Sequence, residues 1–405
     1  MSEVSAATAE TVAGRLADYV VLIHDPNVPE LAPDYFDESE PHYTAVNAAT
    51  TELIAGDPAA TAARAALAAD WSGHGARAEL IAQLVRLLGD APDKVATLGA
   101  LIDEADRRLR IDVVYGAVAT PADAPPVEVD RLAELLRAAP RAVPSDRPQI
   151  QVIIPFRDAS GRDRLRNLLS CLLALHDQEP APDMWVTVIE TDERPRWRDL
   201  LTPLVDSYLF APKGGLFNKS WAVNVAVTND GRDAPLVCVL DADVIADRSF
   251  IARNAGRFAD GSQDAHLPYR RAWCLDEPTS RRAIAARCVQ GLPDVPEEVV
   301  RALVLVGPPG HCMWVTREAY LKVNGFDERF EGWGGEDDDV VARLARDARL
   351  VRHDDRLLHL DHLRPAMVRE DGINFNKHLS ALLDWQPEGR IGDPDRFAHT
   401  VPAGS

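Results

Sequence analysis

The sequence lacks any long hydrophobic run. No stretch of its 405 residues approaches the roughly 18 apolar residues that a membrane-spanning helix needs. The first residues, Met-Ser-Glu-Val-Ser-Ala-Ala, show neither a basic region nor an apolar core, so no signal peptide is expected. These absences predict a cytoplasmic protein without a membrane span.

Cysteine is scarce, and its spacing carries no motif. The five cysteines are odd in number and contain no Cys-X-X-Cys pair of the kind that binds zinc. We expect them to be reduced thiols of the core: Cys171, Cys238, Cys274, Cys288 and Cys312.

Positive charge is also in short supply, because 64 Asp and Glu residues outnumber 44 Lys and Arg residues and give a net charge of −20. A chain this acidic is not expected to bind nucleic acid or an anionic membrane nonspecifically. It can still bind a small anion, since a local group of basic side chains or a metal ion can overcome the global charge. The hydrophobic content of 46% is typical of a globular protein.

Two regions of the chain differ in composition. Residues 1–120 are rich in alanine, and their apolar residues recur at helical spacing over 81–88, before Gly89, and again over 98–109. We expect an α-helical N-terminal domain here. A Pro-rich connector follows at 121–148, with one short helix around 129–138.

From residue 149 onwards, strands and helices alternate. The expected strands are 150–155, 185–189, 205–210 and 235–240, and the expected helices are 165–173 and 221–227. This alternation predicts an α/β domain over 149–385, with a Rossmann-like, mainly parallel sheet and helices on both faces, and a C-terminal tail at 386–405. Ligands of such sheets bind beyond the carboxyl ends of the strands, where residues 155–158, 190–192 and 241–243 would meet.

The most informative stretch is 333–339, Trp-Gly-Gly-Glu-Asp-Asp-Asp, which opens a helical run at 340–346. One or two acids suit the dipole of a first helical turn. Four in a row repel one another, and the two glycines let the backbone approach a ligand closely. We therefore interpret the stretch as a functional site, with a solvated helix cap as the alternative.

A second acidic motif, Asp241-Ala-Asp243, directly follows the apolar strand at 235–240. Residues spaced i, i+2 on an extended chain point to the same side. Two carboxylates at the ligand-binding edge can hold Mg²⁺ or Mn²⁺, and such an ion would assist the departure of a diphosphate.

Two basic elements have both a functional and a structural interpretation. Lys219 begins a helix after a Gly-rich turn, where it can meet a phosphate or be an ordinary solvated lysine. His359 and His362 can converge on one metal only if the backbone turns between them. His353 and His311 are competing ligands, and a purely structural role is equally open.

Taken in order, these motifs resemble those of a GT-A glycosyltransferase, especially the β-1,4-galactosyltransferase family and related N-acetylgalactosaminyltransferases. The resemblance covers roughly residues 150–365. Its segments are 154–157, 217–225, 241–243, 324–326 and 333–339. It implies a GT-A fold, a nucleotide-sugar donor with UDP favoured, and Mn²⁺ or Mg²⁺ as the cofactor.

The resemblance also implies roles for single residues. Asp337 matches the general base that deprotonates the acceptor hydroxyl, and Asp243 matches the carboxylate that binds the metal. Asp241 would join it there, and His359 and His362 have the spacing of a Met and a His that complete the family's metal site. Glu336 and Asp338 would bind sugar hydroxyls or hold the loop. The full set assigned to the donor is Pro155, Phe156, Arg157, Glu190, Phe217, Lys219, Asp241, Trp333, Gly335, Glu336 and Asp338.

The chain departs from the family in several places. The family's second pocket arginine, two residues past Arg157, is Ala159 here, with Arg162 as a possible replacement. Pro308 stands roughly where the family distinguishes galactose from N-acetylgalactosamine, so Gal, GalNAc or a related donor sugar stays open. Golgi members carry a membrane anchor and disulfides; neither is visible here, which favours a bacterial-type cytosol. The acceptor is also open: a glycan, natural product, peptide or lipid-linked sugar.

The expected activity is therefore metal-dependent, inverting transfer of a sugar to an acceptor hydroxyl. A nucleotidyltransferase would also hold Mg²⁺ with paired acids, but it would need a Gly-rich, basic loop after the first strand, where residues 155–158 read Pro-Phe-Arg-Asp. A noncatalytic sugar-binding protein would be expected to have lost Asp243 or Asp337, and both are present.

Overall fold

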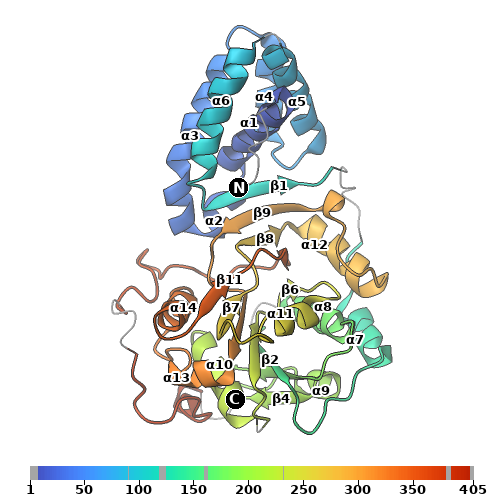
Figure 1. The fold of residues 1–405 in the computed structure, drawn as a ribbon, viewed down its shortest axis with the longest axis vertical. Coiled ribbons are helices and arrows are strands. Elements are labelled where there is room, and N and C mark those ends of the chain that lie inside the picture. The colour runs from blue at the N-terminus through green and yellow to red at the C-terminus, as the bar shows by residue number, and fades with distance from the viewer. Residues whose placement is uncertain are drawn as a thin grey trace. The chain divides into compact units, whose positions relative to one another are not determined.

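The computed structural model describes residues 8–89, 91–117, 125–158, 163–230, 232–379 and 385–401. It divides into two compact units, Met1–Ala122 with Pro296–Gly307, and Asp123–Val295 with Pro308–Ser405 (Figure 1). The boundary predicted at residue 120 lies outside the described residues. The domain limits derived from the sequence stay predictions.

The first unit is mostly helical. Its helices are α1 Ala9–His24, α2 Asn27–Leu31, α3 Pro33–Ile54, α4 Pro58–Ala69, α5 His74–Gly89 and α6 Pro92–Asp106. Helix α1 packs against α3, α4, α5 and α6, and Leu16, Val20 and Leu84 are fully buried. The helix predicted from the apolar spacing over 81–88 is α5, and it ends at Gly89 as expected.

A strand pair in this unit was not predicted. Strand β1 (Ile111–Tyr115) pairs antiparallel with β9 (Arg301–Val306), far along the chain, so no local pattern reveals the pairing. Arg301 anchors β9 in this unit. Its guanidinium lies 2.8 Å from the carboxylate of Asp25 and over the rings of Trp71 and Tyr115.

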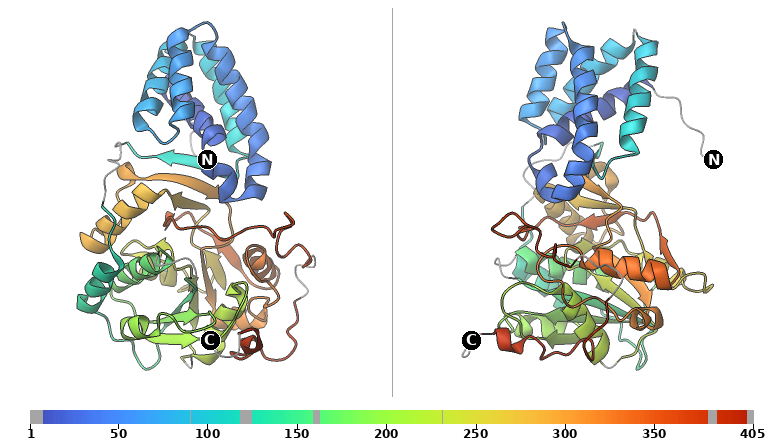
Figure 2. Two further views of the ribbon diagram at one scale, coloured as in Figure 1. Left: turned by 180° about the vertical axis from the view of Figure 1, so that it is seen from behind. Right: turned by 90° about the vertical axis from the view of Figure 1, so that its left-hand side faces the viewer.

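The second unit contains the α/β domain, which Figure 2 shows from two further sides. Its helices are α7 Val129–Ala138, α8 Asp163–His176, α9 Arg198–Leu201, α10 Lys219–Asn229, α11 Phe250–Gly256, α12 Glu277–Ile284, α13 Arg317–Lys322 and α14 Glu336–Asp347. Its strands are β2 Ile150–Phe156, β3 Met184–Glu190, β4 Ser207–Phe210, β5 Leu236–Leu240, β6 Val244–Ile245, β7 Ala265–Leu267, β8 Arg271–Leu275, β10 Cys312–Thr316, β11 Leu350–Arg352 and β12 Leu357–His359.

A seven-stranded sheet organises this unit, in the order β11-β7-β10-β5-β2-β3-β4. Strands β5, β2, β3 and β4 run parallel to one another, and β11 runs parallel to β7. Strand β10 is antiparallel to both of its neighbours. The sheet is therefore mainly parallel, which confirms the predicted α/β class. Within the described residues, none of the helices is both long and apolar enough to cross a bilayer.

Helices cover both faces of this sheet, as predicted. Met313 and Val315 of β10 belong to the core that the sheet forms with α10 and α13. Trp314 lies between them in sequence, and its ring centroid is 6.0 Å from that of Phe250 in α11. Because successive strand residues alternate between faces, α10 and α11 lie on opposite sides of the sheet.

The parallel strands bring the predicted site residues to one edge. Strand β2 ends at Phe156, β3 at Glu190 and β5 at Leu240, immediately before Asp241. Three further strands lie near this edge: β12 pairs with β6 and with β8, and His359 stands opposite Val244 and Cys274. The sheet topology therefore collects carboxylates and histidines from distant parts of the chain.

Candidate active site

Helix α14 begins after a turn that only glycine accommodates well. Gly332, Gly334 and Gly335 have φ values of 78°, 91° and 95°, in the left-handed region that side chains disfavour. A Cβ on Gly335 would also stand 2.6 Å from a ring carbon of Phe330. The amide of Gly332 donates to the carbonyl of Phe217 at 2.8 Å, so the turn is joined to the loop that precedes α10.

The four acids at the start of α14 have different surroundings. Asp338 is exposed, whereas Glu336 and Asp337 are half-buried. Asp339 pairs with Arg343 at 2.5 Å, and both side chains are only 2% exposed. Arg343 also donates to the carbonyl of Gly325 at 2.7 Å. Asp339 therefore holds the helix against the chain that precedes it, and it is the structural member of the four.

Removing Asp339 should destabilise the fold. In Asp339→Ala the guanidinium of Arg343 stays buried without its partner, and such a loss typically costs about 3–5 kcal/mol. Urea unfolding followed by circular dichroism measures the free energy of unfolding. Asp347→Ala, at the exposed end of the same helix, is the matched control and should cost much less. Equal losses in the two variants would contradict the structural role of the pair.

Asp337 lies in a cluster of charged side chains. Both of its carboxylate oxygens are 3.1 Å from Nζ of Lys219, and the same ammonium is 2.9 Å from Oδ1 of Asp241. Lys219 is the first residue of α10, which the side chain of Asn218 caps. One cation therefore bridges the acid at the end of β5 and the acid at the start of α14.

The side chain of Asp337 lies beside Gly310, in space that any larger residue at 310 would occupy. A Cβ at this position would stand 2.6 Å from Oδ2 of Asp337. No role was predicted for Gly310, although the Gly-Pro-Pro-Gly pattern at 307–310 is a turn signal that could have drawn attention to it. The bridging position of Lys219 was also missed, because it depends on two contacts far apart in sequence.

Burial and neighbouring charges shift the pKa values of the ionisable groups in this cluster. Burial raises the pKa of Asp337, and Lys219 opposes that shift without cancelling it. Burial and the charge of Asp337 raise the pKa of Glu336 to about 8. Burial acts to lower the pKa of Lys219, but the carboxylates of Asp241 and Asp337 outweigh it and raise that pKa well above its usual value. Burial therefore favours the protonated form of Glu336, whereas the ammonium of Lys219 favours the ionised form of Asp337.

A second group of side chains has the composition of a metal site. Asp243, His359 and His362 each offer one ligand atom, and these atoms lie within 4.8 Å of one another. Nε2 of His359 is 3.1 Å from Oδ1 of Asp243, and Nε2 of His362 is 3.0 Å from Oδ2. Oδ1 of Asp243 is buried, and the imidazole of His359 faces it.

Strand pairing brings the two histidines together. Strand β12 ends at His359, and the amide of Leu360 donates to the carbonyl of Asp243 at 2.8 Å. The chain then leaves the strand, so His362 reaches the other oxygen of the same carboxylate. Nδ1 of His362 lies 2.9 Å from the carbonyl of Leu363. A proton on Nδ1 would leave the lone pair of Nε2 directed at the site.

These residues fit a divalent cation. Imidazole nitrogen and carboxylate oxygen both suit Mn²⁺, and each oxygen of Asp243 faces one imidazole nitrogen across the site. Burial acts to raise the pKa of Asp243, but His359 and His362 outweigh it and hold that pKa well below the usual value. Asp243 is therefore ionised, as a metal ligand must be.

Three predicted or competing metal ligands lie outside this group. Asp241 is not in the group of three and contacts Lys219 instead. His353 lies 3.2 Å from the amide oxygen of Gln263. The ring centroid of His311 is 4.7 Å from that of His359, and its Nδ1 is 3.7 Å from Asp241. The metal role predicted for Asp241 stays a prediction.

The polar residues assigned to the donor are engaged within the protein. Arg157 donates to the carbonyls of Gly215 at 2.7 Å and Lys213 at 2.8 Å, and so fixes the loop before α10. The carboxylate of Glu190 accepts the backbone amide of Arg196 at 3.0 Å and the hydroxyl of Tyr208.

The apolar residues assigned to the donor differ in burial. Pro155 and Phe156 are buried in β2, and Phe217 and Trp333 are half-buried. All of the donor-binding roles stay predictions. Ala159 and Arg162, where the chain departs from the family pattern, lie outside the described residues.

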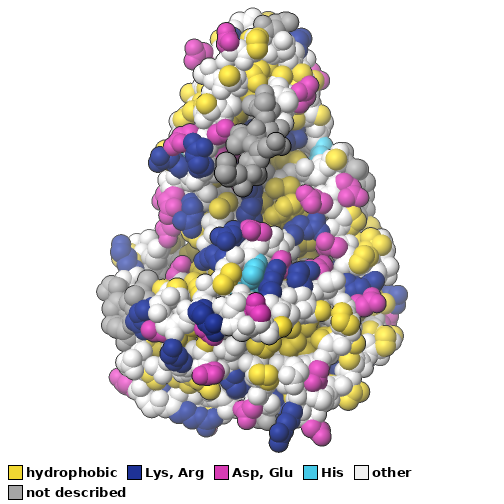
Figure 3. Space-filling view, viewed as in Figure 1, with side chains coloured by type: hydrophobic (Ala, Val, Ile, Leu, Met, Phe, Trp, Pro, Cys, Tyr) yellow, Lys and Arg dark blue, Asp and Glu magenta, His cyan; other side chains and the backbone are white. Residues whose placement is uncertain are grey.

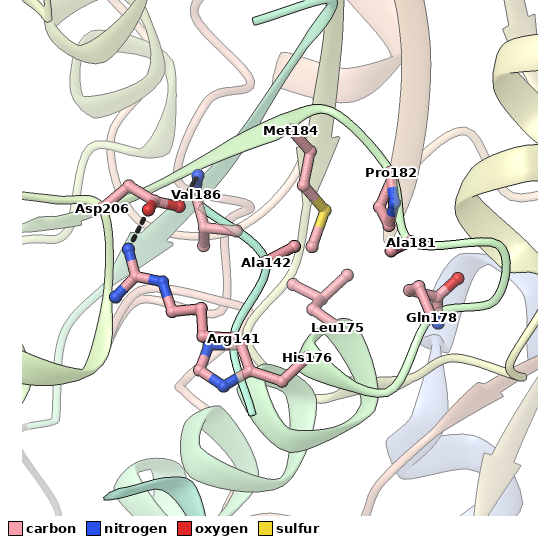
Figure 4. A pocket seen from close by; sticks show the side chains of 10 residues that line it. All are labelled: Arg141, Ala142, Leu175, His176, Gln178, Ala181, Pro182, Met184, Val186 and Asp206. Carbon is pink, nitrogen blue, oxygen red and sulfur yellow. Dashed lines mark hydrogen bonds and ion pairs between the residues drawn. The ribbon is translucent and has the colours of Figure 1, made fainter. Parts of the chain in front are cut away.

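A small pocket lies away from these groups (Figure 4). It is lined by Arg141 and Asp206, which pair with each other, and by Leu175, His176 and Met184. Met184 is the first residue of β3, and Glu190 is the last. The pocket therefore lies at the amino end of that strand, opposite the edge that carries the acids, and we assign it no part in the site.

Comparison with known proteins finds a family match in the second unit. The model for the N-terminal domain of galactosyltransferase matches residues 309–363, which span Gly310, the Gly-rich turn, all four acids and both histidines. A search of curated proteins finds no match.

Solved structures also show similarity, at low identity. A structure of S. aureus TarS is 13% identical, with a TM-score of 0.37, over 53% of this chain and 37% of TarS. A structure of a mutant Drosophila β-1,4-galactosyltransferase 7, complexed with manganese, UDP-Gal and xylobiose, is 13% identical, with a TM-score of 0.33, over 59% of this chain and 76% of that one. This chain thus spans little more than a third of TarS. Together with the mainly parallel α/β sheet, the family match supports a glycosyltransferase of the galactosyltransferase kind.

Proposed function

We propose that this chain is a metal-dependent, inverting glycosyltransferase that transfers a sugar from a UDP-sugar to an acceptor hydroxyl. One observation carries the proposal: two groups of carboxylates at one sheet edge have separate partners. Asp337 shares Lys219 with Asp241, whereas Asp243 faces His359 and His362. The first group suits proton transfer, and the second suits metal binding.

Asp337 acts as the general base in this mechanism. It accepts the proton of the acceptor hydroxyl as that oxygen attacks the anomeric carbon. The new bond from oxygen to carbon forms while the bond from the anomeric carbon to the diphosphate oxygen breaks. A single displacement inverts the anomeric centre, so an α-linked donor yields a β-linked product.

Lys219 positions the base. Its ammonium contacts both oxygens of Asp337 and is itself held by Asp241, so the carboxylate is held in one orientation, and the ammonium opposes the rise in pKa that burial causes. Asp243, His359 and His362 would hold Mn²⁺ or Mg²⁺, which, when bound, supplies positive charge for the departing nucleoside diphosphate.

A panel of nucleotide sugars tests this function directly. With Mn²⁺ present, we expect release of UDP from one UDP-sugar, with UDP-Gal and UDP-GalNAc as the first candidates, and no release after the metal is chelated. UDP-glucose is the matched comparison for the sugar, and GDP-mannose is the comparison for the nucleobase.

Other outcomes of the panel would point elsewhere. Release of pyrophosphate from UTP and a sugar phosphate would favour a nucleotidyltransferase. Binding of a UDP-sugar without any turnover would favour a noncatalytic binding protein. If no nucleotide sugar is bound or turned over, the transferase assignment fails.

A further inference from the structure

His311 lies between the two groups of the candidate active site. It immediately precedes β10, whose first residue, Cys312, stands opposite Leu240 in the pairing with β5. The carbonyl of His311 accepts the backbone amide of Asp241 at 2.9 Å. Strand pairing therefore fixes His311 beside Asp241, at the edge of the sheet that carries both groups.

The imidazole of His311 reaches from one group to the other. Its Nδ1 is 3.7 Å from Oδ2 of Asp241, whereas Lys219 contacts the other oxygen of that carboxylate. Its ring centroid is 4.7 Å from that of His359, with the two rings at 66°. On a further side, the ring of Tyr269 lies 6.2 Å away, centroid to centroid. These neighbours hold the imidazole in a defined place.

Two features of His311 are unusual for a purely structural histidine. Its φ of 69° lies in the left-handed region, which residues other than glycine disfavour, and residues in such conformations cluster at active sites. Its side chain is only 16% exposed, and the buried Nδ1 has no hydrogen-bond partner among the described residues. Because buried polar atoms are normally paired, this nitrogen is available to a ligand.

A hydroxyl group can bridge His311 and Asp241. The 3.7 Å between Nδ1 and Oδ2 is too long for a direct hydrogen bond. A hydroxyl between them would donate its proton to the carboxylate and accept the N–H of the imidazole, because it has one donor and two acceptor positions. A diphosphate oxygen is negatively charged, so the carboxylate would repel it. The pair is therefore suited to a sugar hydroxyl and not to the diphosphate.

The position of His311 favours a hydroxyl of the donor over one of the acceptor. In the proposed displacement, the acceptor oxygen attacks from the side of Asp337, and the diphosphate leaves on the side of the metal ligands. The transferred sugar lies between the two, and so does the imidazole of His311, which faces Asp241 on one side and His359 on the other.

We propose that His311, together with Asp241, binds a hydroxyl of the donor sugar and so helps to select which sugar is transferred; this inference rests on the proposed function. A sugar carries no charge, so its subsite is marked by single hydrogen-bonding groups. Figure 3 shows basic and acidic side chains interspersed on one face of the protein, and such a mixture of charges does not by itself distinguish one sugar from another.

Calorimetry tests the inference with UDP and with UDP-Gal, or with the UDP-sugar that the panel identifies instead, in the presence of Mn²⁺. His311→Gly removes the imidazole, suits the left-handed backbone and keeps the carbonyl that accepts from Asp241. It should weaken binding of the UDP-sugar by about three-fold to ten-fold, the effect of one neutral hydrogen bond. The affinities for UDP and for Mn²⁺ alone should not change. His311→Asn tolerates the same backbone and keeps a side-chain donor, so it should recover part of the loss.

Monodeoxy analogues of the same UDP-sugar identify the hydroxyl. One analogue should bind the unaltered protein about ten-fold to a hundred-fold more weakly than the complete UDP-sugar, because the carboxylate of Asp241 also loses its bond. His311→Gly should not weaken that analogue further, since two changes that remove one interaction are not additive. If no analogue binds the unaltered protein more weakly, the assignment of His311 is wrong, whatever the variants show.

Asp233→Gly is the matched control. Asp233 also has a left-handed φ, of 43°, but its side chain is 92% exposed and it precedes the amino end of β5. The variant relieves a left-handed residue outside the site, so it should bind UDP and the UDP-sugar like the unaltered protein.

The outcomes separate this inference from the proposed function. If the unaltered protein binds neither UDP nor a UDP-sugar in the presence of Mn²⁺, the proposed function fails. If His311→Gly and His311→Asn bind the UDP-sugar as tightly as the unaltered protein does, the assignment of His311 fails and the proposed function stands. The assignment also fails if UDP loses as much affinity as the UDP-sugar, because the imidazole would then act on the diphosphate or through His359.

Discussion

Asp337→Asn should abolish sugar transfer and leave binding of UDP and Mn²⁺ intact. The asparagine keeps the size of the side chain but cannot accept the acceptor's proton, and loss of a general base typically costs about 10²–10⁴-fold in rate. The metal ligands lie in the separate group around Asp243, so nucleotide affinity should persist. Turnover of the active UDP-sugar and calorimetric titration with UDP and Mn²⁺ measure the two properties.

The neighbouring acid makes this test sharper. Burial and the charge of Asp337 raise the pKa of Glu336 to about 8, so Glu336 is the alternative candidate for the base. If Asp337→Asn retains a near-normal rate while Glu336→Gln loses it, the base is Glu336 and our assignment is wrong. Asp347→Asn, at the far end of the same helix, controls for general effects of removing a charge from α14.

Much of the second unit could be predicted from local patterns. The apolar run before Asp241 is strand β5, the Pro-rich connector contains α7 at the expected residues, and the acidic run opens α14. Each of these depends on residues adjacent in sequence. Pairings between distant segments could not be predicted, which is why β1 with β9, and β10 between β7 and β5, appear only in the structure.

For the same reason, only part of the candidate site could be predicted from the sequence. Alternation along an extended chain placed Asp241 and Asp243 on one side, but β5 ends at Leu240, and the amide of Val244 donates to the carbonyl of Asp241. The chain turns there, so strand alternation no longer applies, and the two carboxylates meet different partners. The engagement of Arg157 with two backbone carbonyls likewise depends on a loop more than fifty residues away in sequence.

His362→Ala should remove most of the affinity for Mn²⁺ and, with it, the metal-dependent part of UDP binding. Changes to groups that merely support a metal ligand cost about 10–100-fold in affinity, so loss of a ligand should cost at least as much. Calorimetric titration of Mn²⁺ into the protein without nucleotide measures this directly, and Asp243→Asn should behave in the same way.

His353, one of the competing ligands, supplies the matched control. His353 lies next to Gln263 rather than Asp243, so His353→Ala should bind Mn²⁺ like the unaltered protein. Loss of Mn²⁺ binding in His353→Ala, with retention in His362→Ala, would move the metal site away from Asp243. If UDP binding does not depend on Mn²⁺ in the unaltered protein, Asp243 and its two histidines have no metal role in donor binding, and the carboxylate and imidazoles instead form a structural ion pair next to the base.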